Sequence, residues 1–289
     1  ESVPMEYLYK FSEVNDDKLE SLSLNQLWFS KLNDLNDPFE GEYIISSEVS
    51  DSSDIVSAIK GFINSQGSNV SWELRETYKQ LDAHSGEKLP EKDLNEIVKF
   101  LDDCLEEHMQ AAKQLCACSF IQKSNDKDPL INNLMWSHYS DGLRGYCLKF
   151  DNDIIFKTLG TESNPILTRI TVDYVDAVKA VNSIKYFSEN FHELFPGIFL
   201  PAKIKMYNLF STKSKDWKYE NECRLFAGKS GQMPYSGEAL IEVIIGDKMK
   251  TKHLENLKIN ALKANPKVVF RTARVKTGTY DIELVDVDS

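Results

Sequence analysis

Residues 215–226 read "KDWKYENECRLF", and the charges in this stretch decide how the surrounding sheet is interpreted. If the stretch is a β-strand, successive side chains alternate between the two faces of the sheet. Glu220, Glu222 and Arg224 then share one face, with neighbours roughly 6–7 Å apart. Like charges at this spacing repel unless Arg224 or another neighbour compensates them. The face is therefore either an exposed sheet surface with a Glu–Arg pair or the wall of a site, and both interpretations stay open.

The segments around this stretch predict further strands framed by helices. Alternating or β-branched residues predict strands over residues 6–11, 26–30, 115–121, 145–151, 167–176, 238–247, 267–275 and 280–287. Helical patterns cover residues 15–25, 130–142 (ending at Gly142), 177–195, 199–211 and 250–264. This order predicts an α+β fold with a mixed or antiparallel, split sheet.

Between residues 52 and 113 the pattern changes to apolar residues spaced three and four apart, which is typical of helices. The last of these helices is expected to follow Pro90, because proline is favoured at helix starts. We therefore predict a single α+β domain over residues 1–289, with a helical insertion at 52–113.

Composition narrows the class of protein. The chain has 289 residues, of which 42% are hydrophobic and 27% charged, so it can bury a sizeable core. The formal net charge of −11 argues against passive binding to a phosphate backbone. Its five cysteines fit small buried residues in a reducing compartment better than a disulfide framework or a metal site. No apolar run approaches the length of a membrane span and no leader precedes the first strand, so we expect a cytoplasmic protein without a membrane partner.

The segment "MWSHYSDG", residues 135–142, gathers side chains that could carry chemistry. His138 is a candidate general acid or base, because imidazole titrates near neutral pH. Alternatively, Trp136 and Tyr139 pack into the core while His138 satisfies a backbone carbonyl. Arg144 precedes the next strand and is a candidate anion clamp. It could equally form a structural pair with Asp141 or Glu222.

Four blocks in the chain carry a family resemblance. They are "LWFSKLNDLNDPFEGE" (27–42), "CACSFIQ" (116–122), "MWSHYSDGLRGYCLKFD" (135–151) and "DWKYENECRLF" (216–226). Their order resembles the bacterial domain-of-unknown-function family twenty-nine seventy-one, and it looks related to AbiGi-type abortive-infection proteins. The resemblance covers most of the chain, the helical insertion being the least typical part. It implies an effector in bacterial antiviral defence or a toxin.

A weaker resemblance is to ADP-ribosyltransferases, whose arginine-modifying branch carries a Glu-x-Glu pair on a late strand. It implies that Glu222 stabilises the oxocarbenium-like charge when the glycosidic bond of NAD breaks, and that Glu220 orients or deprotonates the acceptor. Lys10 stands where an early strand usually supplies Arg or His, and Ser119 where a middle strand often carries Ser. Adjacent His138 and Tyr139 do not reproduce the His…Tyr…Glu arrangement of that family. For an enzyme of this kind we expect Glu222, Glu220 and His138 as catalytic residues and Lys10, Ser119, Trp136, Tyr139, Arg144 and Arg224 as NAD-binding residues.

Two other classes of function stay open. One is a non-enzymatic sensor whose pocket, lined by Trp28, Phe29, Trp136 and Arg144, binds a nucleotide or a phage component. The other is a metal-dependent phosphodiesterase or nuclease built on Asp37, Glu40, His138 and Glu222. For the "LNDPFEG" loop (35–41), an Asx turn before Pro38 explains Asn36 and Asp37 without a metal. For the transferase we expect a protein or nucleic-acid acceptor and a cognate antitoxin as partners.

Overall fold

The computed structural model describes residues 6–35, 37, 39, 41–46, 52–66, 72–83, 91–123, 128–190 and 207–286. The chain separates into two compact units. Unit 1 comprises residues 1–36, 115–174 and 213–289, and unit 2 comprises residues 37–114 and 175–212. The helical insertion predicted at 52–113 therefore lies in unit 2 together with a second, later segment. That all 289 residues form one domain stays a prediction.

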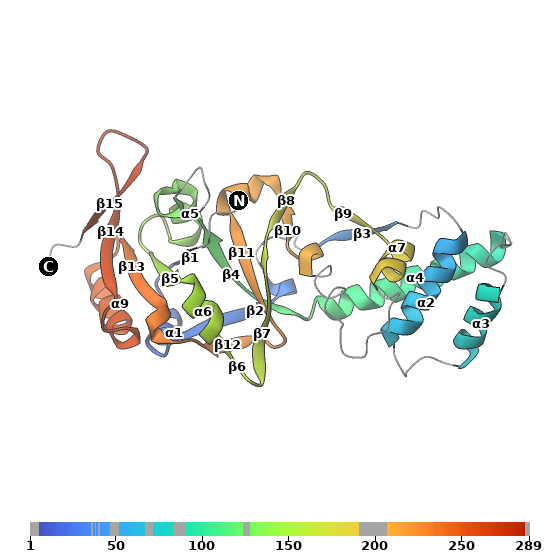
Figure 1. The fold of residues 1–289 in the computed structure, drawn as a ribbon. Helices are drawn as coiled ribbons and strands as arrows, with labels where there is room; N and C mark the ends of the chain where they lie inside the picture. The colour runs from blue at the N-terminus through green and yellow to red at the C-terminus, as the bar shows by residue number, and fades with distance from the viewer. Residues whose placement is uncertain are drawn as a thin grey trace. The chain divides into compact units, whose positions relative to one another are not determined.

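Unit 1 is built on one large twisted sheet (Figure 1). Its strands are β1 (Tyr7–Ser12), β2 (Gln26–Lys31), β4 (Cys116–Gln122), β5 (Tyr146–Asp151), β6 (Gly160–Thr161), β7 (Asn164–Thr171), β11 (Glu222–Ala227), β12 (Gly231–Pro234), β13 (Leu240–Gly246), β14 (Val269–Val275) and β15 (Ile282–Asp286). They follow the order β15-β14-β13-β5-β1-β4-β11-β7-β6, while β2 pairs with both β4 and β12. Neighbours are antiparallel except β13 and β14. The predicted α+β class with a mixed, largely antiparallel sheet is confirmed.

The two faces of this sheet bury different helices. On one face, α1 (Asp16–Ser23) and α9 (Thr251–Ala264) place Leu19 and Leu257 in a core with Phe120 and Phe150. We call this the α1/α9 face. On the other, the α5 face, α5 (Asn133–Tyr139) buries Trp136 in a separate core. A strand residue therefore reaches one core or the other, according to the pleat.

Side-chain caps set the ends of the helices in unit 1. Asn15 caps α1 by accepting a hydrogen bond from the Lys18 amide at 2.8 Å, as its sequence position predicts. Helix α5 ends at Tyr139, three residues before the predicted end at Gly142. The helix stops early because Asp141, Gly142 and Leu143 all have positive φ angles, which a right-handed helix excludes.

Unit 2 contains the helices α2 (Ser52–Gln66), α3 (Trp72–Ala83), α4 (Glu91–Ala112) and α7 (Ser183–Asn190) and a parallel pair of strands, β3 (Tyr43–Ser46) and β9 (Lys179–Asn182). The three predicted helices of the 52–113 segment are confirmed. The Tyr43 hydroxyl donates to Glu106 at 2.9 Å and ties β3 to α4. Every helix in the described ranges is too short or too polar to cross a bilayer.

Three predictions about elements need correction. The stretch 177–195 is not one helix, because β9 precedes α7 and pairs with β3; residues 191–195 lie outside the described residues. The strand predicted over 167–176 is divided into β7 and β8 (Asp173–Val175). For the helix predicted at 199–211, only residues 207–209 are described as helical. In addition, α6 (Asn152–Thr158), β3 and β12 had not been predicted.

Substitution of Gly145 tests the close packing between the turn after α5 and strand β1. A Cβ atom at this position would lie 2.2 Å from the backbone oxygen of Ser12. Because backbone atoms cannot move aside locally, Gly145→Ala should lower the free energy of unfolding by about 1–3 kcal/mol. Urea denaturation measures this, with Gly228→Ala as the control. At Gly228 the nearest atom would be the Asn164 side-chain oxygen at 3.8 Å. Equal stability of the two variants would contradict the packing described here.

Candidate functional site

The stretch 215–226 is not one continuous strand, which corrects the first prediction. Residues Lys215–Glu220 form a 3₁₀ helix, Asn221 adopts a left-handed conformation with φ 45°, and β11 begins at Glu222. Asparagine tolerates this conformation better than most residues. Its side-chain amide also donates to the Gln122 carbonyl at 2.9 Å, which holds the turn against β4. Pleat alternation therefore places Glu222 and Arg224, but it does not place Glu220.

Both carboxylates nevertheless converge on one lysine. Lys213 lies on β10 (Thr212–Ser214), which pairs with β8. Its ammonium lies 2.8 Å from Glu220 Oε2 and 3.0 Å from Glu222 Oε2. Arg224 donates two hydrogen bonds to the Glu222 carboxylate, from Nε to Oε1 at 2.7 Å and from Nη2 to Oε2 at 3.1 Å. We call these four residues the Lys213 cluster.

The cluster is buried, so the question raised by the charge pattern has an answer. Glu220 is 1% exposed, Glu222 2% and Arg224 0%. The three charges do not form a solvated sheet surface. With two carboxylates, one ammonium and one guanidinium, the formal charges cancel within the cluster. Burial of such a set without full pairing would be strongly unfavourable.

Neighbouring side chains complete the hydrogen bonding. The Tyr139 hydroxyl, at the end of α5, donates to Glu220 Oε1. The amide of Glu222 donates to the Tyr174 hydroxyl oxygen at 2.8 Å. Ser119 on β4 lies on the same face of the sheet as Glu222, where its side chain favours the charged carboxylate and lowers its pKa. The Glu222 carboxylate therefore already accepts one hydrogen bond from Lys213 and two from Arg224.

The protonation states follow from burial and from these contacts. Burial raises the pKa of Glu222, and Lys213 and Ser119 oppose that rise. Burial lowers the pKa of Lys213, but the two carboxylates more than reverse this and leave it above its ordinary value of 10.5. Burial and the hydrogen bond to Glu220 raise the pKa of Tyr139, so its phenol stays protonated and donates.

Three aromatic rings lie on the exposed side of the cluster. Lys213 Nζ lies 5.3 Å from the centroid of the Trp217 ring, within cation–π distance. The exposed His138 ring lies 6.5 Å from that of Trp217 and 5.9 Å from that of Tyr219. Within the described residues, the buried Tyr219 hydroxyl has no hydrogen-bond partner. His138 is thus close to the cluster through Tyr219 and through its neighbour Tyr139.

Three of the residues expected at the same site lie elsewhere. Lys10 pairs with Leu148 across β1 and β5 and faces the α1/α9 side, whereas Glu222 pairs with Ile121 and faces the α5 side. Arg144 is exposed and contacts the carbonyl of Asp141 at 3.0 Å, because the turn after α5 directs it outward.

Trp136, the third of these residues, is 1% exposed, and its indole donates to the Leu130 carbonyl at 2.8 Å, as expected of a core residue. The four residues expected to line a sensor pocket also do not share one. Trp28 is exposed on β2, Phe29 is fully buried beside it, Trp136 is in the α5-face core and Arg144 is on the surface.

The metal hypothesis finds little support in the described residues. Asp37 accepts a hydrogen bond from the Phe39 amide at 3.0 Å, which is the Asx turn weighed above. Asn36, Pro38 and Glu40 lie outside the described residues. Within the part of the chain that the structure describes, no group of three or more metal-ligating side chains gathers.

Sequence reasoning missed two members of the site, Lys213 and Tyr174. The signal for Lys213 was indirect: two carboxylates so close together require a compensating cation. Its position could not be read from the chain because β10 has only three residues and belongs to a separate two-stranded sheet.

Removing Lys213 should leave two buried carboxylates undercompensated. Lys213→Met is therefore expected to lower the free energy of unfolding by about 3–5 kcal/mol. In a double-mutant cycle, the Lys213→Met/Glu220→Gln protein should be more stable than the sum of the single changes predicts. Lys18→Met is the control, because the Lys18–Glu13 pair is partly exposed and should contribute less than about 1 kcal/mol. Additive effects in the cycle would contradict the geometry of the cluster.

Alkaline pH should weaken the contribution of Lys213. Its pKa in the folded protein is raised above 10.5, so its stabilisation is fully present below pH 10.5 and is lost as pH rises through the folded pKa. The difference in unfolding free energy between wild type and Lys213→Met should stay constant from about pH 7 to 9 and shrink above 10.5. Urea denaturation across this range measures it; a difference that widens with pH would contradict the assignment.

A comparison with known protein families matches the part of the chain that carries the Lys213 cluster. Residues 135–225 match a family model described as "Protein of unknown function (DUF2971)". No curated protein and no solved structure matches the chain. The matched segment contains Tyr139, Lys213, Glu220, Glu222 and Arg224, but neither Lys10 nor Ser119. The expected resemblance to family twenty-nine seventy-one is therefore confirmed: the segment that carries the Lys213 cluster matches DUF2971.

Proposed function

We propose that the Lys213 cluster belongs to an ADP-ribosyltransferase-like enzyme that breaks the bond between nicotinamide and ribose in NAD. One observation carries the proposal. Glu220 and Glu222 meet at one cation, on the same side of the sheet as Ser119 of the neighbouring strand. A transition state that develops positive charge is stabilised best by a carboxylate whose position is fixed beforehand.

Glu222 meets that requirement for a fixed position. The two contacts from Arg224 hold its carboxylate plane, and the backbone is held by Tyr174. In this proposal Glu222 faces the developing ribosyl cation. Glu220, whose carboxylate is bound by Tyr139 and Lys213, orients or deprotonates the acceptor.

The position of Lys213 imposes a condition on this chemistry. Its ammonium already neutralises both carboxylates, so a substrate cation can reach Glu222 only where Lys213 withdraws. Exchange of one positive charge for another keeps the buried site neutral, which lowers the electrostatic cost of the exchange. Lys213 is thus proposed to occupy, in the free protein, the place of the positive charge that develops in the reaction.

The fit of the rest of NAD to the cluster is partial. Arg224 is committed to Glu222, and Lys10 and Arg144 lie away from the cluster. Lys215 and Lys218 are exposed on either side of Trp217 in the 3₁₀ helix and are candidate cations for the phosphate groups. The acceptor class, protein or nucleic acid, and a role in bacterial defence remain part of the proposal through the family resemblance alone.

Nicotinamide release from NAD tests this function, with cell extract added to supply acceptors. Wild type should release nicotinamide, and Glu222→Gln should lower the rate by at least about 100-fold because the fixed negative charge is lost. Glu222→Asp, which keeps the charge, should retain more activity than Glu222→Gln.

The matched control is Glu242→Gln. Glu242 is a buried carboxylate on β13 that pairs with Lys149 at 3.3 Å and with Arg271, outside the Lys213 cluster. Glu242→Gln should release nicotinamide at a rate within about threefold of wild type. Its free energy of unfolding should fall about as much as that of Glu222→Gln, because both changes remove the charge of a buried carboxylate that pairs with two cations. The transferase proposal fails if wild type releases no nicotinamide, or if folded Glu222→Gln releases it as fast as wild type.

A further inference from the structure

A second feature of unit 1 lies on the α1/α9 face, the opposite side of the sheet from the Lys213 cluster. There, residues of α1, β1, β2, β5 and β12 enclose a cavity of about 670 Å³. This volume falls within the range of ordinary small-molecule sites. The Lys213 cluster contributes none of its lining residues.

Lys10 provides a positive charge in this cavity. Its side chain extends from the central strand β1 across the Phe120 ring, and its ammonium donates to the Ser119 carbonyl at 2.9 Å. In the described part of the chain it has no carboxylate partner. A half-buried ammonium with a free donor and no counter-ion is suited to an anionic group.

Tyr235 contributes part of the cavity wall. It lines the same cavity, is 6% exposed, and its buried hydroxyl makes no hydrogen bond among the described residues. Tyr146 is the other buried tyrosine that lines the cavity. Because the Tyr235 hydroxyl has essentially no accessible surface, Tyr235 offers the cavity the apolar part of its ring.

The rim supplies an apolar surface and limits the charge of a ligand. Trp28 and Leu24 line the cavity and are 55% and 56% exposed, respectively. A flat ring can pack against such an indole. Asp17, Lys18 and Glu20 also line the cavity from α1. Lys18 is paired with Glu13 at 3.2 Å, so the two carboxylates at the rim would repel a ligand with several negative charges.

We propose that this cavity binds a small organic anion that carries one acidic group on a flat, apolar ring system. The acidic group contacts the Lys10 ammonium, and the ring packs against Trp28 and Leu24. This site is separate from the proposed transferase chemistry and does not depend on it.

Two fluorescent probes of nearly equal shape test the proposal. They are 1-anilinonaphthalene-8-sulfonate, which carries one negative charge, and neutral N-phenyl-1-naphthylamine. Wild type should bind the sulfonate more tightly than the amine. Lys10→Met should lower the affinity for the sulfonate about tenfold, because the charged contact is lost. The affinity for the neutral amine should stay within about twofold of the wild-type value. Retained binding of the amine also shows that the variant is folded.

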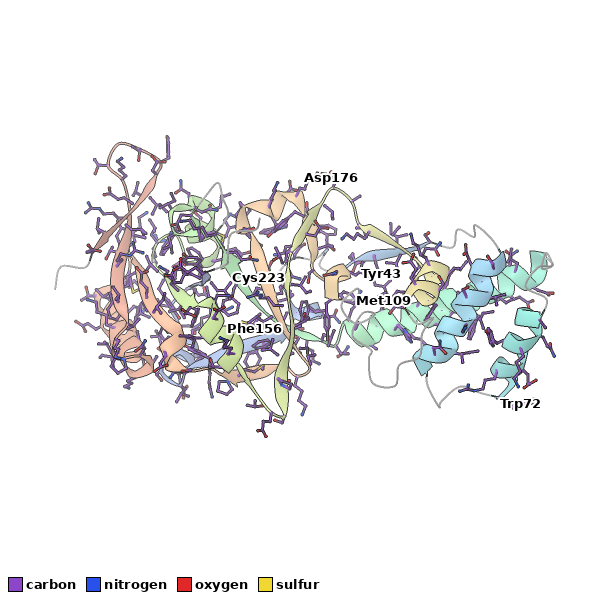
Figure 2. The ribbon with its side chains drawn as sticks, viewed as in Figure 1. Tyr43, Trp72, Met109, Phe156, Asp176 and Cys223 are labelled. Atoms are coloured by element: carbon purple, nitrogen blue, oxygen red, sulfur yellow. The ribbon has the colours of Figure 1, made fainter. Side chains whose placement is uncertain are left out.

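Two further variants separate a ligand role from a structural one. Tyr235→Phe should leave the binding of both probes within about twofold and should not lower the melting temperature of the free protein, because the buried hydroxyl neither faces the cavity nor makes a hydrogen bond in the described residues. Trp28→Ala should weaken the binding of both probes, whereas Trp72→Ala should weaken the binding of neither. Trp72 is the other exposed tryptophan; it is 70% exposed on α3 and is labelled in Figure 2. No binding of the sulfonate by wild type, equal binding by Lys10→Met, or equal effects of Trp28→Ala and Trp72→Ala would overturn the proposal.

Discussion

The carboxylates of Glu220 and Glu222 are buried side by side, and the structure around them depends on their compensation. Lys213 forms ion pairs with both carboxylates, and Arg224 donates two hydrogen bonds to that of Glu222. These two cations come from different strands, β10 and β11, and Tyr139 adds a donor from the end of α5. The need to keep two buried negative charges paired therefore fixes how three separate segments of the chain meet.

The large sheet separates two kinds of site. On the α5 face, β11 directs Glu222 and Arg224 to the ionic cluster, while Cys223 between them, labelled in Figure 2, enters the opposite core. On the α1/α9 face, β1 directs Lys10 into a cavity. Because side chains alternate along a strand, Lys10 and Glu222 cannot serve one site, although their strands are separated only by β4.

Much of the fold could be predicted from sequence, because most strands and the helices of residues 52–113 carry their own periodicity. The path through residues 215–226 could not: a six-residue 3₁₀ helix can carry the same alternation of polar and apolar residues as a strand. Both carboxylates were identified, and so was the need for a nearby cation. Strand order and register decide that Lys213 joins the cluster, which side of the sheet Lys10 faces and that Arg144 points outward. A local sequence pattern does not determine strand order or register.

The central claim is that Lys213 holds the place of a substrate cation, and its accessibility tests this claim most directly. Acetylation of Lys213 by an amine-reactive ester, quantified by mass spectrometry, should be slow in the free protein, because its side chain is 8% exposed and ion-paired twice. Saturating NAD should accelerate the acetylation of Lys213 and leave that of Lys149, paired with Glu242, unchanged. If NAD leaves the acetylation of both lysines unchanged, the ammonium is a permanent structural counter-ion and the transferase account of the cluster is contradicted.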